Sequence, residues 1–246
     1  MLDHGLDQAE GLRRLMSPPA FSLMALPIDP SSDEAWIPPL ARALRSLGAR
    51  PIVLDGSRGQ LARAFGLQPR YELLDLLEGA RTFDDVAPCT REGVYLVRAD
   101  RGLDAFIASG ADCGQLARGF AQLPQAFDMF LVVLPAAELA SLAAPALTVP
   151  VVGLDSSDAG LTRGYQLIKQ LSSRFGYRRF AAVVREAQGA CGARGAHARL
   201  MTVARGFLDV DVAFAGGIGR DAAARGALAE LAHHLLHTVA TPLTLH

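Results

Sequence analysis

The chain has 246 residues, of which 50% are hydrophobic and 20% charged, and its mean hydropathy is +0.22. This composition excludes a disordered protein, because disordered chains have too little apolar surface to bury. With a net charge of −1 and an isoelectric point near 6.6, the chain lacks the long-range positive field that attracts nucleic acid. Of its 24 lysines and arginines, only Lys169 is a lysine.

Cysteine usage and apolar runs favour a cytoplasmic protein. Cys89, Cys113 and Cys191 are odd in number and widely spaced, so a disulfide framework is not expected. The N-terminus has no apolar core of a signal peptide. Acids and prolines interrupt the most apolar stretch, residues 127–154, before it approaches the roughly 20 residues of a membrane-spanning helix.

The N-terminal segment is predicted to be a separate amphipathic helix. Apolar residues recur at helical spacing from Leu2 to Met16, and Ser17-Pro18-Pro19 then ends the helix. We therefore expect residues 1–17 to form a detached helix and residues 20–246 to form one domain.

The rest of the chain alternates short apolar runs with helical patterns. Predicted strands cover 21–26, 51–55, 93–97, 129–134, 149–154, 180–184 and 210–215, and predicted helices cover 34–47, 71–77, 113–123, 136–143, 161–175, 196–208 and 221–238. Most strands are apolar throughout, which is typical of strands covered on both faces. The pattern predicts an α/β fold with a largely parallel, doubly wound sheet and helices on both faces. Ligands in such folds bind beyond the carboxyl ends of the strands.

The loop after the first strand, residues 27–34, lacks the features of a phosphate loop. It contains no glycine to wrap an anion with backbone N–H groups and no lysine to reach the terminal phosphates. Its acids, among them Asp29, would repel a polyphosphate. Ser31 or Ser32 is predicted to cap the following helix.

The other candidate sites are explained by ordinary structural roles. Gly189–Gly195 has the wrong spacing for a dinucleotide fingerprint, and both this cluster and Gly216–Gly219 are predicted to be turns. His233 and His237 lie four residues apart on one helical face and could ligate a metal. No neighbouring carboxylate completes such a site, so a solvated helix face is favoured.

Three stretches carry recognisable motifs. Residues 7–15 read DQAEGLRRL, residues 44–71 contain LRSLGARPIVLDGSRGQL and FGLQPRY, and residues 160–180 contain YQLIK and RFGYRRF. In this order they resemble the DQAxxLR helix, the ALxxLGxxVLLxDADLGLAN passage and the AYALIKxLxxxYGxxxF passage of MinD/ParA-type ATPases, in particular the flagellar-number regulators of the FlhG/FleN type. The resemblance spans about residues 3 to 225 and implies a P-loop NTPase-like fold.

The chain departs from this family at the nucleotide site. The KGGxGKT loop is absent, the acidic DxD retains only Asp55 with Ser57 at its second acidic position, and the apolar run ending at Leu134-Pro135 lacks the Walker B acid. The family otherwise uses ATP and magnesium, and the losses predict a pseudo-ATPase with no catalytic residue, no metal ligand and no cofactor. The vestigial cleft would comprise Asp29, Ser31, Ser32, Asp55 and Ser57.

The resemblance implies two further contacts. In the family the N-terminal helix engages the signal-recognition-type flagellar GTPase FlhF and stimulates it, and the corresponding residues are Asp7, Gln8, Ala9, Leu12 and Arg13. The alternative is that this helix packs on its own domain. The family also has a C-terminal amphipathic helix that touches the membrane. Here Arg225 is the only cationic residue near 227–239, so we expect membrane contact to be weak or absent. We expect this segment to pack into the core instead.

Together these features predict a cytoplasmic, non-hydrolysing regulator of flagellar number or placement that acts through protein contacts. A flagellar transcription activator or basal-body components are further candidate partners, and partners could recruit the protein to the cell pole or inner membrane face. Two alternatives stay open. The first is an active ATPase with a non-standard phosphate loop at Gly189–Gly195, and the second is a MinD-like scaffold for another machine, such as cellulose secretion or chromosome segregation.

Overall fold

The computed structural model describes residues 21–29, 34–110, 113–125, 127–146, 148–185, 189–219 and 224–243. The predicted helix at 1–17, with Asp7, Gln8, Ala9, Leu12 and Arg13, lies outside these residues.

The described residues form strands that alternate with helices along most of the chain. The strands are β1 (Phe21–Ile28), β2 (Pro51–Asp55), β3 (Tyr95–Arg98), β4 (Met129–Pro135), β5 (Val151–Asp155), β6 (Arg179–Arg185), β7 (Asp211–Ile218) and β8 (Thr241–Leu243). The helices are α2 (Ile37–Ser46), α3 (Gln60–Ala64), α4 (Leu73–Leu77), α5 (Phe83–Val86), α6 (Asp100–Ala108), α7 (Cys113–Ala121), α8 (Ala136–Leu142), α9 (Asp158–Phe175), α10 (Gly189–Leu208) and α11 (Ala224–His234), followed by the π-helical turn η1 (Leu235–Val239).

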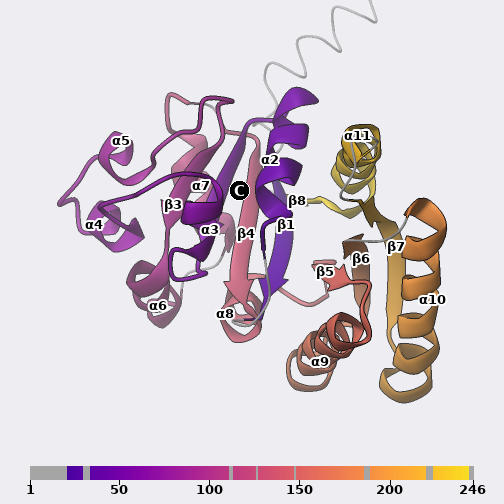
Figure 1. The fold of residues 1–246 in the computed structure, drawn as a ribbon. Helices are drawn as coiled ribbons and strands as arrows, with labels where there is room; N and C mark the ends of the chain where they lie inside the picture. The colour runs from indigo at the N-terminus through magenta and orange to yellow at the C-terminus, as the bar shows by residue number, and fades with distance from the viewer. Residues whose placement is uncertain are drawn as a thin grey trace, which may run out of the picture.

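The strands are arranged as two hydrogen-bonded sheets. Within the described part of the chain, one sheet has the order β3-β2-β4-β1-β8 and the other has the order β5-β6-β7. Every pairing is parallel except that of β8, which runs antiparallel to the start of β1. β5 lies beside β1, so the second sheet continues the first across a break (Figure 1). The predicted parallel, doubly wound α/β fold is confirmed, whereas β8 was not predicted.

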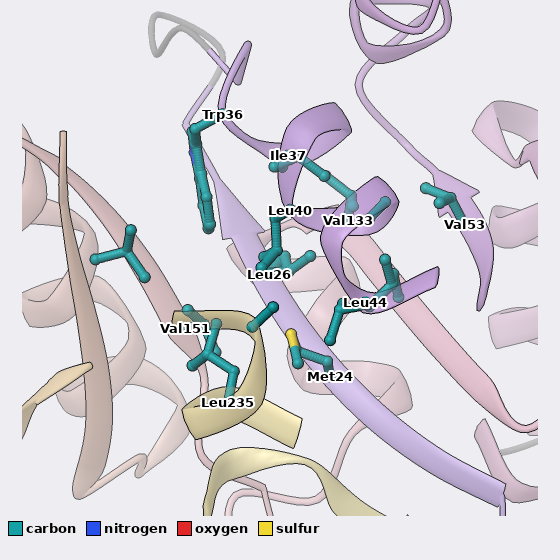
Figure 2. Close-up of a cluster of buried hydrophobic side chains, with 14 of the residues drawn as sticks. Met24, Leu26, Trp36, Ile37, Leu40, Leu44, Val53, Val133, Val151 and Leu235 are labelled. Atoms are coloured by element: carbon teal, nitrogen blue, oxygen red, sulfur yellow. The ribbon is translucent and has the colours of Figure 1, made fainter. Parts of the chain in front are cut away.

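The side chains of the central strands alternate between two apolar layers. On β4, Met129, Leu131 and Val133 belong to the cluster that contains α2, α3 and α11. The intervening residues 130, 132 and 134 face the cluster formed with α4 to α8. Figure 2 shows the first layer, where Leu40 of α2 and Leu235 of η1 lie against the strand side chains. The prediction that helices cover both faces is therefore also confirmed.

The glycine clusters were predicted wrongly as turns. Gly189–Gly195 forms the first turns of α10, which begins seven residues earlier than predicted. Gly216 and Gly217 lie inside β7. They suit that strand because a side chain there would crowd the neighbouring helices: an added Cβ would lie 3.0 Å from Leu231 of α11 at Gly216 and 2.7 Å from Ala193 of α10 at Gly217.

The C-terminal segment packs into the core, as expected. Leu231, Leu235 and Val239 are buried, and Leu228 and Leu236 pack against the same cluster. The predicted helix over residues 221–238 is confirmed from Ala224 onwards, as α11 followed by η1, and β8 comes after it. No helix among the described residues is both long and apolar enough to span a membrane.

Candidate functional site

The candidate site lies where β1, β4 and β2 end side by side, at the start of α2 (Figure 1). β1 extends two residues further than predicted, so Pro27 and Ile28 pair with Leu134 and Pro135 of β4 instead of forming a loop. Positions 30–33, with the predicted Ser31 and Ser32, lie outside the described residues.

At the start of α2, residues 37–39 offer no N–H group to an anion. The N–H of Ile37 donates to Glu34 O at 3.0 Å, and Pro38 and Pro39 have no N–H to donate. The N–H of Leu40 donates to Trp36 O at 3.3 Å. The N-terminus of a helix binds phosphate through such free N–H groups, and at residues 37–39 they are used or missing. Trp36 occupies the N-cap position, so the predicted cap by Ser31 or Ser32 is wrong.

Trp36 fills the space between α2 and β5. Its indole Nε1 donates to Glu34 Oε2 at 2.9 Å, and the ring is buried. The ring lies so close to Gly153 that an added Cβ would stand 2.7 Å from Nε1. Figure 2 shows the indole beside Ile37 at the top of the core cluster. Gly153 is therefore required by this contact.

A cavity of about 20 Å³ lies at the ends of β1 and β5, and its lining includes Glu34 and Gly153. This volume suits about one water molecule and is far below that of a ligand pocket. The charged side chains that line it are Asp29, Glu34, Asp155, Arg163 and Arg185. The predicted cleft residue Asp29 thus borders a small charged cavity.

Asp55 and Ser57 lie together, but they form a buried hydrogen-bonded pair and not an open site. Asp55 is fully buried, and its Oδ1 accepts bonds from Ser57 N at 2.8 Å and Ser57 Oγ at 2.5 Å. Its Oδ2 accepts from Ala62 N at 3.1 Å, and Ser57 Oγ in turn accepts from Leu61 N at 2.8 Å. The pair satisfies N–H groups at the start of α3 and fixes the turn that leads into it.

Burial raises the pKa of Asp55 above its ordinary value of 3.8. Desolvation is the largest cause, and the bonds from Ser57 and Ala62 oppose it. Asp100 nearby raises the pKa further through like-charge repulsion. A carboxylate that is hidden from solvent and already accepts three hydrogen bonds is poorly placed to bind a metal or orient a water molecule.

The position of the family's Walker B acid is closed by backbone and apolar contacts. β4 ends at Pro135, which leads directly into α8. The N–H of Gly56 donates to Val133 O at 2.9 Å, and an added Cβ on Gly56 would lie 2.6 Å from Leu134 Cδ2. The turn after β2 therefore sits directly on the end of β4.

The remaining candidates do not form sites. The rings of His233 and His237 lie 4.4 Å apart on an exposed face. Nowhere in the described ranges do three or more histidines, cysteines or acids gather as a metal site would require. The helical conformation of Gly189–Gly195 contradicts a phosphate-binding loop there. Lys169 is exposed on α9.

Sequence reasoning missed the contribution of Trp36, Pro38 and Pro39. Prolines are tolerated early in a helix, but their consequence for anion binding depends on α2 following β1 directly. Two consecutive prolines in the first turn after the first strand are a usable signal, because each removes one N–H group from the place where a phosphate loop needs them.

The strand order and the placement of α2 after β1 define a MinD/ParA-type P-loop fold. The cell division ATPase MinD from Pyrococcus furiosus superposes with a TM-score of 0.58 at 14% identity, covering 87% of this chain and 97% of MinD. Cobyrinic acid a,c-diamide synthase from Mycobacterium smegmatis, with bound ADP and magnesium, gives 0.60 at 18% identity, covering 91% and 99%. At these identities the likeness establishes the fold alone.

A sequence relative identifies the family. The antiactivator FleN from Pseudomonas aeruginosa is 31% identical over 196 residues, which cover 77% of this chain and 69% of FleN. The chain therefore belongs to the FlhG/FleN family within the MinD/ParA-type fold. No model of a known protein family matches the chain.

Proposed function

We propose that this chain is a non-hydrolysing regulator of the FlhG/FleN type that acts in the cytoplasm through protein contacts and controls flagellar number or placement. The observation that carries the proposal is the start of α2, where residues 37–39 have no N–H group free for a phosphate. In a P-loop fold this turn is the place where backbone donors would hold the anion.

ATP and magnesium do not fit the residues present. Asp55 is buried and engaged by Ser57 and Ala62, and the apolar run of β4 ends at Pro135 without the acid that follows it in the family. Lys169, the single lysine of the chain, lies exposed on α9 and does not line the small cavity at the ends of β1 and β5. These features support a regulatory role that proceeds without nucleotide turnover.

The proposed partner contact uses the N-terminal DQAxxLR motif, and it rests on family resemblance. Gln8 and Arg13 would approach the active site of a signal-recognition-type GTPase, where an arginine can stabilise charge and a glutamine can orient water. Recruitment to the cell pole would then follow from the partner.

Nucleotide assays test the first part of the proposal. We expect no ATP hydrolysis above a buffer blank, with MinD from Pyrococcus furiosus as the positive control. We also expect no change in the fluorescence of Trp36, the single tryptophan of the chain, when Mg-ATP is added. Hydrolysis by the wild type that Asp55→Asn abolishes in a folded sample would overturn the proposal.

A binding assay tests the second part. The double variant Gln8→Ala/Arg13→Ala should lose binding and stimulation of the flagellar GTPase from the same organism. The matched control is Gln166→Ala/Arg174→Ala, which removes the same side chains from the exposed face of α9. Unchanged stimulation by the first variant would remove the N-terminal helix from the mechanism.

A further inference from the structure

A second cleft, of about 380 Å³, lies at the carboxyl ends of β2 and β3. It is bounded by the turn after β2 and by α4 and α6, which pack against each other at this edge of the molecule (Figure 1). Four arginines line it: Arg58, Arg70, Arg98 and Arg101. We name this surface the arginine cleft.

Each of the three acids in the arginine cleft is already engaged within the protein. Asp100 accepts from Arg98 Nη2 at 2.6 Å and from the backbone N–H of Arg58 at 3.1 Å. Glu72 accepts from Arg101 Nε at 2.5 Å. The third acid, Asp75, accepts from the backbone N–H of Glu72 at 2.8 Å as part of the capping box of α4.

Two guanidinium groups are left over. Arg58 and Arg70 are exposed, and neither side chain makes a hydrogen bond or ion pair with any residue that the structure describes. Four arginines against three acids leave one positive charge unbalanced in the cleft. A guanidinium presents a planar set of donors that matches a carboxylate oxygen pair.

Arg58 adopts a backbone conformation that is unfavourable for a residue with a side chain. Its φ of +57° lies in the left-handed region, which disfavours residues with a side chain. Glycine would adopt this conformation more easily, and the DADLGLAN passage of the FlhG/FleN family has leucine at this point. The turn nevertheless carries an arginine whose N–H is bonded to Asp100.

We propose that the arginine cleft binds a carboxylate side chain from an acidic segment of a partner protein, gripped between Arg58 and Arg70. This inference rests on the proposed action through protein contacts and names the chemistry of one contact surface. A single carboxylate balances the unpaired charge. The negative charge of a polyphosphate would exceed this single positive charge several-fold, and the polyphosphate would face three acids at close range. The charges therefore favour the carboxylate.

The test is fluorescence anisotropy with a labelled glutamate-rich peptide and the full chain, at about 50 mM NaCl to limit screening. The same peptide with glutamine in place of glutamate serves as the neutral probe. We expect binding of the glutamate peptide only, weakened at least about tenfold by Arg58→Gln/Arg70→Gln. The matched control Arg91→Gln/Arg179→Gln removes the same charge from exposed positions outside the cleft lining and should bind as the wild type does.

Two further variants separate a binding role from a structural one. Arg58→Gly should keep or raise the thermal midpoint, because it relieves the left-handed strain, while it weakens peptide binding. Arg58→Lys/Arg70→Lys keeps the charge but loses the planar donors, so its affinity should fall between those of the wild type and the glutamine variant.

Several outcomes would overturn this assignment. They are no binding of the glutamate peptide, equal binding of the glutamine peptide, no loss in Arg58→Gln/Arg70→Gln, or tighter binding of ATP or a phosphoserine peptide to the cleft. ATP hydrolysis is measured separately on the same samples. Turnover together with arginine-dependent binding of the glutamate peptide would refute the non-hydrolysing function and leave the cleft intact.

Discussion

At the scale of single residues, Asp55 shows how an acid of a nucleotide site can serve structure instead. In the family pattern this acid begins the DxD motif, and here a serine replaces the second acid. The hydroxyl of Ser57 donates to Asp55, and its oxygen accepts from the N–H of Leu61. A second carboxylate at position 57 could not donate to Asp55 and would repel it. The result is a buried acid that fixes the turn into α3.

The pH dependence of stability should reveal this burial. The raised pKa of Asp55 means that the folded state holds a proton more tightly than the unfolded state, whose pKa is near 3.8. The contribution of Asp55 to the free energy of unfolding is therefore greatest below 3.8 and declines as pH rises through the raised pKa. Asp55→Asn cannot titrate, so the wild type should lose stability relative to this variant from about pH 4 upwards.

Urea unfolding from about pH 4 to about pH 7 measures this difference. At pH 7 we expect Asp55→Asn to cost about 1–3 kcal/mol, because its amide places donors against backbone N–H groups, and the cost should be larger at pH 4. Asp85→Asn is the control, for which the stability difference from the wild type should change with pH in the opposite direction. The bonds from Thr82 lower the pKa of Asp85, so the wild type there should lose relative stability as pH falls. A cost of Asp55→Asn that does not vary with pH would contradict the raised pKa.

The sequence alone identifies Asp55 and Ser57 as site candidates, but it does not show that they fix the turn into α3. The spacing from the family motif identified both positions. Their burial depends on Gly56 resting on Val133, a contact with a strand far along the chain. The arginine cleft was missed for the same reason: Arg58 and Arg98 come together through the pairing of β2 with β3, and the packing of α4 against α6 completes the cleft.

At the scale of elements, the fit between α2 and β5 depends on one glycine. We expect Gly153→Ala to destabilise the fold by about 1–3 kcal/mol, because the added methyl group would overlap the Trp36 indole. Thermal or urea unfolding measures this, and Trp36 fluorescence reports the local displacement. The matched control is Gly195→Ala, which meets nothing within 4 Å in α10 and should stabilise by about 0.5–1 kcal/mol. Equal effects of the two substitutions would contradict the close contact.

Most strands and the longest helices were predictable, whereas three helices and one strand were missed. β2 was predicted with its bounds at Pro51–Asp55, and the other predicted strands differ by a few residues at their ends. α3, α5 and α6 were missed. α3 and α5 have five and four residues, too few for a helical period to emerge, and α5 is defined instead by the capping box of Thr82 and Asp85. β8 escaped prediction because its three residues gain their partners only beside β1.

At the scale of the whole molecule, one apolar cluster joins the two hydrogen-bonded sheets. Met24 and Leu26 of the first sheet share it with Val151 and Val183 of the second, and Leu235 packs into it from η1 (Figure 2). The two sheets have no hydrogen-bonded strand pair between them among the described residues, so this shared layer is one physical link between them, and the packing of α8 on α9 is another. We therefore expect residues 20–246 to unfold as one cooperative unit.

Leu235→Ala tests that expectation. Leu235 is fully buried, so its truncation should lower the free energy of unfolding by about 2–5 kcal/mol. Because the cluster belongs to both sheets, Trp36 fluorescence and far-UV circular dichroism should still report one coincident transition at a lower urea concentration. Leu77→Ala removes a leucine that is 46% exposed and should cost less than about 1 kcal/mol. If the fluorescence transition shifts away from the circular dichroism transition, the two sheets unfold independently and residues 20–246 comprise more than one domain.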